Sequence, residues 1–428
     1  MDVTFCRTET TILFLMLIIQ LLTNRMLTHR QLFLKNVAQT SDFPLALEIE
    51  RAEGIYMYDK KGKQFMDLIS GIGVSNVGHR HPKVVEAIHH QVDKYLHLMV
   101  YGEYVQTPQV LLAEALVKTL GNPCLLSPPT TDRPMLNNVY FTNSGTEAVE
   151  GAMKLAKRYT GRQEIISCIN AYHGATQGAL SLSGSENFKR NYRPLLPKIK
   201  QIRHGNFEDI QQISCRTAAI FIEVIGGEAG VRVPDSQYFI ELRKQCDLTG
   251  TLLIIDEIQT GFGRTGTFWA FEQFGFYPDV LLCAKGMGGG MPIGAFIANE
   301  KVMGVFKNNP ILGHITTFGG HPVSAAASLA TLNVILNEKL LEHVKRKAQI
   351  FKDLLVHSKI KEVRNQGLMM AVEFADFDTL KPIIDRAIEK GIITDWFLFC
   401  DNSMRIAPPL IITEEEIRKA CSIILESI

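Results

Sequence analysis

The sequence lacks the cysteine patterns of a disulfide framework or a zinc site. Its eight cysteines include no CxxC pair and no Cys/His spacing of a zinc site, and they stand at positions 6, 124, 168, 215, 246, 283, 400 and 421. We therefore expect free thiols, a reducing compartment and no bound metal. His79, His81, His89 and His90 lack a partnering Cys or carboxylate pattern, so we expect them at a helix start and on the surface.

An excess of charge of one sign is also missing. Lysine and arginine total 45, aspartate and glutamate total 44, and the net charge is +1 with no long run of one sign. A broad basic face is therefore not expected, and we predict no nucleic-acid partner. Apolar residues make up 46% and charged residues 21%, which excludes an intrinsically disordered chain, and 428 residues suffice for two or three domains.

No hydrophobic run is long enough to span a membrane. The apolar stretch from Thr11 to Leu22 has about a dozen residues, whereas a spanning helix needs roughly 20. Two interpretations of residues 1–25 stay open: a signal peptide with Arg7 in its charged region, or an apolar extension or start-site artefact ahead of Met26. The second is favoured because no small-residue cleavage site follows. We expect a cytoplasmic protein without a membrane partner.

Linkers rich in Ser and Gly and internal repeats are absent as well, and the loosest stretch, Gly121 to Pro134, is predicted to be a surface loop. Between residues 138 and 298, short apolar runs alternate with helical patterns, and these runs are NVYF, EIISC, AAIFIEV, LLIID, VLLCA and IGAFIA. Strands that are apolar throughout indicate a mostly parallel sheet buried on both faces. Such a sheet binds its ligand at the carboxyl ends of its strands, so the polar residues after each run are the candidates for a site.

The first candidate is the segment 143–147 (NSGTE), which follows the first run and opens a predicted helix over Ala148 to Tyr159. Ser144, Gly145 and Thr146 are small enough for the backbone to approach an anion, and free N–H groups at a helix start hold phosphate. The same pattern also fits an ordinary helix N-cap. Both interpretations stay open for this motif alone.

The second and third candidates are Asp256 and Lys285, each at the end of an apolar run. Asp256 would suit the magnesium site of a nucleotide hydrolase, but the GxxxxGK[ST] loop is absent, since the only Gly-Lys pair, at 62–63, has Met57 where the first Gly should be. An Asp here instead suits a cationic ring nitrogen. Lys285, which runs into a glycine-rich turn, suits a phosphate ligand or a Schiff-base nucleophile. An anion site, a carboxylate and an amine together match the needs of pyridoxal phosphate.

With these residues in place, the sequence from about Leu32 to its C-terminus resembles the class III aminotransferases of fold type I, the group that includes acetylornithine, ornithine and 4-aminobutyrate aminotransferases. The motifs that carry the resemblance are SGIGVSNVGHRHP (70–82), NSGTEAVEGAMKLAKR (143–158), AYHG (171–174), LIIDEIQTGFGRTG (253–266), AKGMGGGMPIGA (284–295), TTFGGHP (316–322) and RIAPPL (405–410). The resemblance implies an α/β fold with a large cofactor-binding domain over 82–322. A smaller α+β domain would combine 26–81 with 323–428.

Helical periodicity within that smaller domain predicts helices over Glu338 to Leu355 and Glu414 to Ser427. These helices would flank strands around Met369 to Phe374 and Arg405 to Ile406.

The resemblance also implies a division of roles around pyridoxal phosphate. Lys285 would form the Schiff base with the cofactor aldehyde and, once freed by substrate, move the proton between Cα and C4′. Asp256 would pair with the ring nitrogen. The other cofactor contacts would come from Ser144, Gly145, Thr146, Tyr172, His173, Glu223 and Gln259. In this family Thr317 reaches the phosphate of the neighbouring subunit, which implies a homodimer or a higher homo-oligomer with shared active sites.

For the substrate, Arg405 resembles the family's carboxylate-binding arginine, which is suited to bidentate capture. Glu223 and Glu228 match acidic positions near the substrate, and one of them would pair with Arg405 when no carboxylate is bound. Ile72 stands where ornithine aminotransferases carry a Tyr that helps to select ornithine, so it counts against ornithine itself.

Three departures from the family pattern alter the rim of the expected site. Ala175 replaces an Arg that acetylornithine, ornithine and 4-aminobutyrate enzymes commonly have after the aromatic-His-Gly triplet. Gly226 replaces the Gln of the family's Glu-Pro-Ile/Val-Gln-Gly-Glu motif, and His321 replaces a usual Asn. One carboxylate anchor is therefore missing.

The function implied is a transaminase that moves the terminal amino group of an ω-amino acid, of the acetylornithine or 4-aminobutyrate kind, to a keto acid. The expected acceptor is 2-oxoglutarate, and the expected mechanism is ping-pong. An amine:pyruvate transaminase or an aminomutase on the same cofactor remains an alternative. A non-catalytic regulatory protein that binds pyridoxal phosphate is disfavoured, because no DNA-binding segment is appended and no catalytic position is lost.

Overall fold

The computed structural model describes residues 27–121 and 134–428, so the expectation for residues 1–25 and most of the predicted loop 121–134 lie outside the described residues. The contacts divide the chain into two units, one made of residues up to 51 together with 58–63, and the other of 52–57 and 64–428. The division falls inside the strands β1 (Ile49–Glu53) and β2 (Tyr56–Asp59). Each unit is described by itself below.

The first unit contains the helix α2 (His29–Asn36), which is amphipathic only weakly and buries none of its residues. A capping box begins it: Thr28 Oγ1 accepts from the N–H of Gln31, and Gln31 Oε1 accepts from the N–H of Thr28 at 2.9 Å. In the same unit the guanidinium of Arg51 lies over the ring of Tyr58, 3.6 Å from its centroid. Local hydrogen bonds and one cation–π contact therefore stabilise this unit.

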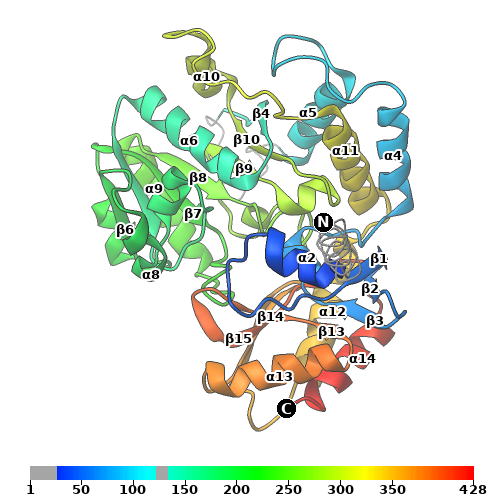
Figure 1. Cartoon of the computed structure of the whole chain (residues 1–428). Helices are drawn as coiled ribbons and strands as arrows, with labels where there is room; N and C mark the ends of the chain where they lie inside the picture. Colours follow the sequence, from blue (N-terminus) through cyan, green and yellow to red (C-terminus); the bar gives the residue numbers. More distant parts are fainter. Residues whose placement is uncertain (1–26, 122–133) are drawn as a thin grey trace, which may run out of the picture. The chain divides into compact units, whose positions relative to one another are not determined.

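The second unit is built on a seven-stranded sheet in the order β4-β10-β9-β8-β7-β5-β6 (Figure 1). Its strands are β4 (Asn138–Thr142), β5 (Glu164–Cys168), β6 (Ile199–Ile202), β7 (Thr217–Glu223), β8 (Leu252–Asp256), β9 (Val280–Cys283) and β10 (Gly294–Ala298). Only β10 runs antiparallel to its neighbours, so the predicted α/β fold with a mostly parallel sheet is confirmed. All six predicted apolar runs are strands; β6, with polar Lys200 and Gln201 in its centre, escaped prediction.

The strands are apolar throughout because both faces of the sheet are covered. In β7, Ala219 and Phe221 pack in one hydrophobic cluster with α6 (Gly145–Thr160), whereas Ile220 and Ile222 pack in another with α9 (Ser236–Thr249). Successive residues of a strand point to opposite faces, so a strand between two helical layers needs an apolar residue at every position.

The second unit contains further helices. α11 (Pro322–Asn337) lies beside α4 (Pro82–Val92) and α5 (Thr107–Thr119), as Figure 1 shows. The shorter helices are α3 (Ser70–Gly73), α7 (Gln177–Leu182), α8 (Glu186–Lys189) and α10 (Glu300–Met303). None of the helices in the described ranges 27–121 and 134–428 has the length and apolar character to cross a membrane.

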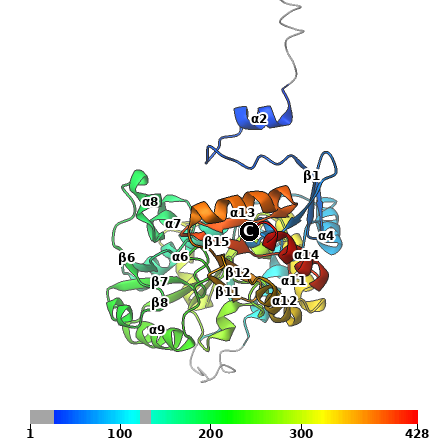
Figure 2. The same cartoon turned by 90° about the horizontal axis from the view of Figure 1, so that it is seen from below.

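A second, antiparallel sheet has the order β11-β12-β15-β14, from β11 (Glu362–Gln366), β12 (Met369–Glu373), β15 (Cys400–Ile406) and β14 (Asp395–Phe397). Around it lie α12 (Leu341–Leu354), α13 (Phe377–Glu389) and α14 (Glu414–Leu425), seen together in Figure 2. The short strand β13 (Ile392–Ile393) pairs in parallel with β3 (Gln64–Asp67). The two helices and two strands predicted for this region are confirmed, with α12 starting three residues later than predicted. The predicted domain boundaries at 82 and 322 remain a prediction.

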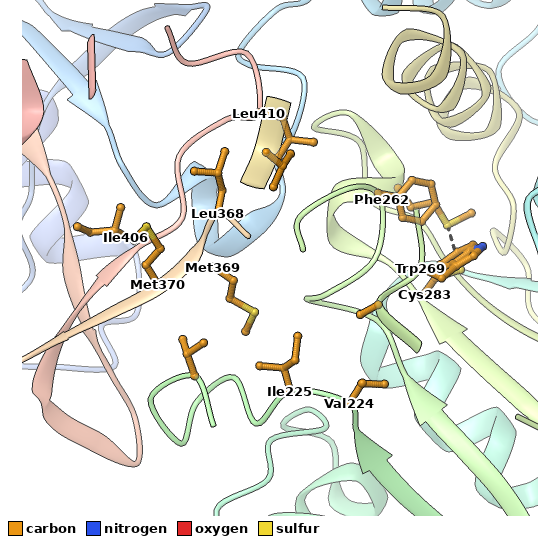
Figure 3. Close-up of a cluster of buried hydrophobic side chains, with 14 of the residues drawn as sticks. Val224, Ile225, Phe262, Trp269, Cys283, Leu368, Met369, Met370, Ile406 and Leu410 are labelled. Carbon is orange, nitrogen blue, oxygen red and sulfur yellow. Dashed lines mark hydrogen bonds between the residues drawn. The ribbon is translucent and has the colours of Figure 1, made fainter. Parts of the chain in front are cut away.

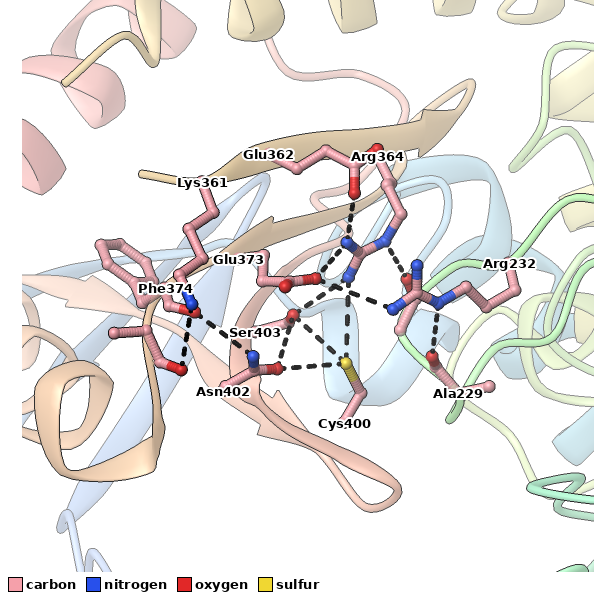
Figure 4. A network of polar contacts seen from close by, with 12 residues as sticks. Ala229, Arg232, Lys361, Glu362, Arg364, Glu373, Phe374, Cys400, Asn402 and Ser403 are labelled. Atoms are coloured by element: carbon pink, nitrogen blue, oxygen red, sulfur yellow. Dashed lines mark hydrogen bonds and ion pairs between the residues drawn. The ribbon is translucent and has the colours of Figure 1, made fainter. Parts of the chain in front are cut away.

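The two sheets of the second unit share an apolar core. Figure 3 shows Val224 and Ile225, which follow β7, close to Met369 of β12, with Ile406 of β15 in the same cluster. A polar network adds to this contact (Figure 4): Arg364 of β11 donates to the carbonyl of Gly230 at 2.8 Å and also pairs with Glu373. The segment 226–232, which carries Glu228, is therefore held against the second sheet.

Candidate active site

The carboxyl ends of the parallel strands surround a cavity of about 510 Å³, within the range of small-molecule and cofactor sites. Its wall comes from segments far apart in the sequence, all at strand ends or helix starts. The predicted site residues on this wall are Ser144, Gly145, Thr146, Tyr172, His173, Glu223, Glu228, Asp256, Gln259 and Lys285. The cavity thus lies where the strand pattern predicted a ligand.

Asp256, the last residue of β8, is buried and fully hydrogen-bonded. Its Oδ2 lies 2.7 Å from Nδ1 of His173, and its Oδ1 accepts from the N–H of Ile258 at 2.9 Å. Burial by itself would lower the pKa of His173, but the hydrogen bond and the charge of Asp256 outweigh it and raise that pKa. His173 thereby fixes the orientation of the carboxylate toward the cavity.

Lys285 follows β9 directly and has a backbone conformation that side-chain-bearing residues rarely adopt, with φ of 45°. Strain of this kind persists only where the surrounding structure enforces it, and it gathers at functional sites. Burial lowers the pKa of the Lys285 amine against the opposing effect of Glu228. A larger share of the amine is therefore neutral, as a nucleophile requires.

The start of α6 forms the candidate anion site. Ser144 caps the helix by accepting from the N–H of Glu147 at 3.3 Å, so the N-cap interpretation is correct. Within the described part of the chain, no acceptor takes the N–H of Gly145 or of Thr146, and these groups line the cavity. A β-carbon at Gly174 would lie 2.2 Å from Thr146 Oγ1, so only glycine leaves room beside this helix start. The geometry suits a phosphate.

Two further cavity residues depend on a close backbone approach. A β-carbon at Gly227 would lie 1.9 Å from Oε1 of Gln259, so the glycine lets this side chain sit beside the chain segment that follows β7. Glu223 accepts from the N–H of Gly227 at 3.3 Å, and burial raises its pKa to about 7. Tyr172 presents its ring on the same wall, and its N–H reaches Glu223 at 3.4 Å.

Arg405 does not line the cavity; it lies behind Glu228, which does. The two side chains form a buried bidentate pair with distances of 2.8 and 2.9 Å. Although burial would raise the pKa of Glu228, Arg405 outweighs it and lowers that pKa. Of the two glutamates left open by the sequence, Glu228 is the partner of Arg405.

Besides Arg405, two predicted residues are not on the cavity wall. Thr317 is exposed, and a single chain does not test its predicted role toward a neighbouring subunit. Ile72 is half-buried with φ of 64°, and Val74 lines the cavity in its vicinity. Sequence reasoning gave no role to Asn143, Ile258, Met291 and Pro292, which also line the cavity. Each lies inside one of the motifs that carry the family resemblance, and this position was the available signal.

The departures from the family pattern have separate structural accounts. Ala175 lies on the cavity wall, where a long cationic side chain would have projected toward a substrate. Gly226 exchanges two backbone hydrogen bonds with Arg232, and His321 caps α11 by accepting from the N–H of Val323 at 3.3 Å. Only the first alters the cavity directly.

The histidines of the 79–90 region make ordinary contacts. His79 lies 2.9 Å from Asp67, and His81, at the start of α4, lies 3.7 Å from Glu338. No cluster of three or more metal-ligating side chains occurs among residues 27–121 and 134–428.

Comparison with known proteins agrees with this geometry. The profile of the family described as Aminotransferase class-III matches residues 37–428. The acetylornithine aminotransferase of Methanopyrus kandleri is 38% identical over 385 residues, covering 89% of this chain and 93% of the relative. That of Methanosarcina mazei is 40% identical over 376 residues, covering 87% of this chain and 89% of the relative. The chain belongs to the class III aminotransferases.

Solved structures lead to the same class III fold. An ornithine aminotransferase from Toxoplasma gondii is 29% identical with a TM-score of 0.84, covering 94% of this chain and 95% of that chain. A transaminase from the marine bacterium Virgibacillus, 26% identical, has a TM-score of 0.84 and covers 93% of this chain and 97% of that chain. The fold is therefore that of the fold type I enzymes that depend on pyridoxal phosphate.

This class III aminotransferase is a pyridoxal-phosphate-dependent transaminase, and its cavity fits that cofactor. The N–H groups of Gly145 and Thr146 at the start of α6, which have no acceptor in the described chain, would hold a phosphate, and Gly174 leaves room for the Thr146 side chain beside them. Nε2 of the buried His173 has no partner within the described chain, which leaves a polar atom at the site free for a bound group. Asp256 and Lys285 offer the carboxylate and the amine that the ring and aldehyde need.

Proposed function

We propose that the enzyme transfers the terminal amino group of an ω-amino acid to a keto acid, with 2-oxoglutarate as the acceptor, in a ping-pong reaction. One observation carries this proposal: Lys285, Asp256 and the Glu228–Arg405 pair meet at a single cavity. The amine of Lys285 and the carboxylate of Asp256 would bind the cofactor. Arg405, which lies behind Glu228, would bind the carboxylate of a substrate. The names of the acetylornithine aminotransferase relatives support an amino donor of this class.

Pyridoxal phosphate, when bound, supplies an aldehyde for the amino group and a ring that withdraws electrons. In the proposed reaction, Lys285 holds and returns the proton that moves at the substrate's Cα, and its lowered pKa favours that exchange. Asp256, oriented by His173, would pair with the ring nitrogen of the cofactor. Ser144, Gly145 and Thr146 would hold the phosphate, and Tyr172 and Gln259 would contact the ring.

The acceptor's carboxylate is proposed to displace Glu228 from Arg405. A carboxylate that replaces another carboxylate keeps the charge balance of the buried arginine, which avoids leaving an unpaired charge. A substrate without a carboxylate leaves the Glu228–Arg405 pair intact. Such an exchange lets one cavity accept substrates with and without a charge at that position.

A second candidate function has a specific observation in its favour. Ala175 offers no cation to a second carboxylate, and Arg405 is covered by Glu228, so an amine without a carboxylate also fits the cavity. A PLP-bound amine transaminase from an uncultivated Pseudomonas species is 27% identical, with a TM-score of 0.80, and covers 92% of this chain and 97% of that chain. An amine:pyruvate transaminase is therefore the alternative; an aminomutase or a non-catalytic regulator has no such observation.

A screen of donors against acceptors separates these functions. The holoenzyme is assayed with N-acetylornithine, 4-aminobutyrate, ornithine and a simple primary amine, each with 2-oxoglutarate and with pyruvate. We expect the highest kcat/KM for one of the first two donors with 2-oxoglutarate. Turnover confined to the simple amine with pyruvate would establish the alternative. Absence of turnover with every pair would contradict both.

A further inference from the structure

The surroundings of Arg405 contain a second carboxylate that the family resemblance did not indicate. Asp395, in β14, accepts from Nε of Arg405 at 2.9 Å, whereas Glu228 takes the two terminal nitrogens. The carbonyl of Trp396 accepts from Nη2 at 3.2 Å, and the ring of Phe397 lies 4.5 Å from the guanidinium carbon. Three consecutive residues of β14 therefore hold one arginine.

The two carboxylates differ in their relation to the cavity. Glu228 is on the cavity wall and takes the two terminal nitrogens of Arg405, whereas Asp395 is not on that wall and takes Nε. A substrate carboxylate entering from the cavity reaches the terminal nitrogens and competes with Glu228 alone. Asp395 stays bound to Arg405 throughout such an exchange.

The strand pairing explains why Asp395 is in this position. Asp395 and Arg405 are directly opposite each other in the antiparallel β14–β15 pair. Side chains of opposite residues in such a pair lie on the same face and within contact distance. The hydroxyl of Thr394 also donates to the carbonyl of Arg405 at 2.7 Å, so both the backbone and the side chain of the arginine are fixed from β14 and the residue before it.

We propose that Asp395 is a positioning residue that keeps the two terminal nitrogens of Arg405 facing the cavity when Glu228 yields to a substrate carboxylate. The proposal rests on the proposed function, in which Arg405 binds that carboxylate. The guanidinium of an arginine is planar but stands on three flexible methylene groups, so a hydrogen bond to Nε fixes the direction in which its two terminal nitrogens point. With the anchor, the carboxylate meets a fork that is already aligned, and the ordering cost of binding is smaller.

Two substitutions at position 395 separate the negative charge of Asp395 from its role as a hydrogen-bond acceptor. Asp395→Asn keeps an oxygen acceptor for Nε but removes the charge. Without the negative charge of residue 395, Arg405 attracts Glu228 and a substrate carboxylate more strongly by the same amount. The equilibrium between these two carboxylates at Arg405 therefore changes little. Asp395→Ala removes the acceptor, so Arg405 is free to turn away from the cavity. Only the second substitution damages a positioning role.

The experiment measures KM and kcat for 2-oxoglutarate, and the inhibition constant of glutarate as a non-reacting dicarboxylate, on the full-length holoenzyme. For Asp395→Ala we expect KM and the glutarate constant to rise about tenfold, with kcat for a donor lacking a carboxylate nearly unchanged. For Asp395→Asn we expect changes below about threefold. Asp401→Ala, which removes an exposed carboxylate of β15, is the matched control.

Three outcomes overturn the proposal: Asp395→Ala behaves like Asp401→Ala, Asp395→Asn raises KM as much as Asp395→Ala, or KM and kcat fall together for all donors. If Asp395→Ala fails to fold, Asp395→Leu, which fills the site with an apolar side chain but offers no acceptor, takes its place. Arg405→Lys separates the two proposals. If Arg405→Lys leaves KM for 2-oxoglutarate unchanged, the carboxylate role of Arg405 in the proposed function fails; if it raises KM while Asp395 variants do not, only the positioning role fails.

Discussion

At the residue scale, the site combines groups whose ionisation is set by burial. Lys285 and Glu223 both lie on the cavity wall, where burial lowers the pKa of the first and raises that of the second to about 7. Groups shifted toward neutral pH exchange protons readily under working conditions. The chemistry of this enzyme is therefore concentrated in a few side chains at strand ends.

The first prediction concerns Lys285. Purified wild-type protein should be yellow, and borohydride should attach the cofactor irreversibly to a peptide that contains Lys285, as read by mass spectrometry. Lys285→Ala should lose at least about 10³-fold in kcat because it lacks both the nucleophile and the proton carrier. Lys301→Ala, an exposed lysine, serves as control. Labelling at another lysine, or wild-type turnover by Lys285→Ala, would contradict the assignment.

A second prediction at this scale concerns Glu257, which is fully buried away from the cavity. Burial raises its pKa to about 7, against hydrogen bonds from Thr260 and the N–H of Phe271. The folded protein therefore binds this proton more tightly than the unfolded chain. The stabilisation is complete below pH 4.5 and is lost as the pH rises through 7.

Glu257→Gln should therefore flatten the decline in melting temperature between pH 5 and pH 8. The corresponding change in the free energy of unfolding over this range should be smaller than in the wild type by up to about 3 kcal/mol. Thermal unfolding of both proteins across this range measures the difference. Glu415→Gln, on the exposed side of α14, is the control. Parallel curves for wild type and Glu257→Gln would show that this carboxyl titrates normally.

At the scale of elements, one buried arginine joins three segments of the second unit. Arg264, in the loop after β8, donates to the carbonyl of Leu368 at 3.0 Å, to that of Pro408 at 2.5 Å and to Oδ1 of Asn76 at 2.6 Å. Burial lowers its pKa to about 9. The arginine therefore ties the loop after β8 to the segments around Asn76, Leu368 and Pro408.

The third prediction follows from that arrangement. Arg264→Leu should reduce the free energy of unfolding by about 3 kcal/mol or more, because three buried acceptors would lose their donor. Thermal and urea unfolding of the holoenzyme measure this loss. Arg418→Leu, which replaces an exposed arginine of α14, is the control. Equal melting temperatures for the two variants would mean that water or a neighbouring group replaces the guanidinium.

At the scale of the whole molecule, the second unit exposes large apolar side chains in two segments. Val105 is 93% exposed and Ile311 75%, and Leu96, Leu98, Ile315 and Phe318 are also largely exposed. The rings of His97 and Phe318 lie 4.9 Å apart, so the two segments are neighbours, and exposed apolar side chains gathered in this way are typical of an interaction surface. Thr317, predicted to reach a neighbouring subunit, lies in the second of these segments.

The fourth prediction is that the enzyme is a homodimer through this surface. Light scattering should give about twice the chain mass of 47.9 kDa. Phe318→Glu should shift the protein toward monomer and weaken cofactor retention, since Thr317 would no longer reach the neighbouring site. Phe188→Glu, which alters an exposed aromatic on α8, is the control. A wild-type monomer with full activity would rule out a shared active site.

The strands, the order of the motifs and the strand-end residues Asp256 and Lys285 could be predicted from the sequence alone. Burial on both faces of a parallel sheet demands unbroken apolar runs, and such runs are visible without any knowledge of the fold. The strand β6 could not be found in this way, because its central Lys200 and Gln201 break the apolar run.

Contacts between segments far apart in the chain were decided only by the tertiary structure. The sequence left Glu223 and Glu228 as equal candidates for Arg405; the packing of the segment after β7 against β15, 177 positions away, selects Glu228. Asp395 carried no signal in the sequence, because its importance depends on its register opposite Arg405 in an antiparallel pair. Local patterns determine elements and strand-end chemistry, whereas pairings across sheets depend on the free energy of the whole fold.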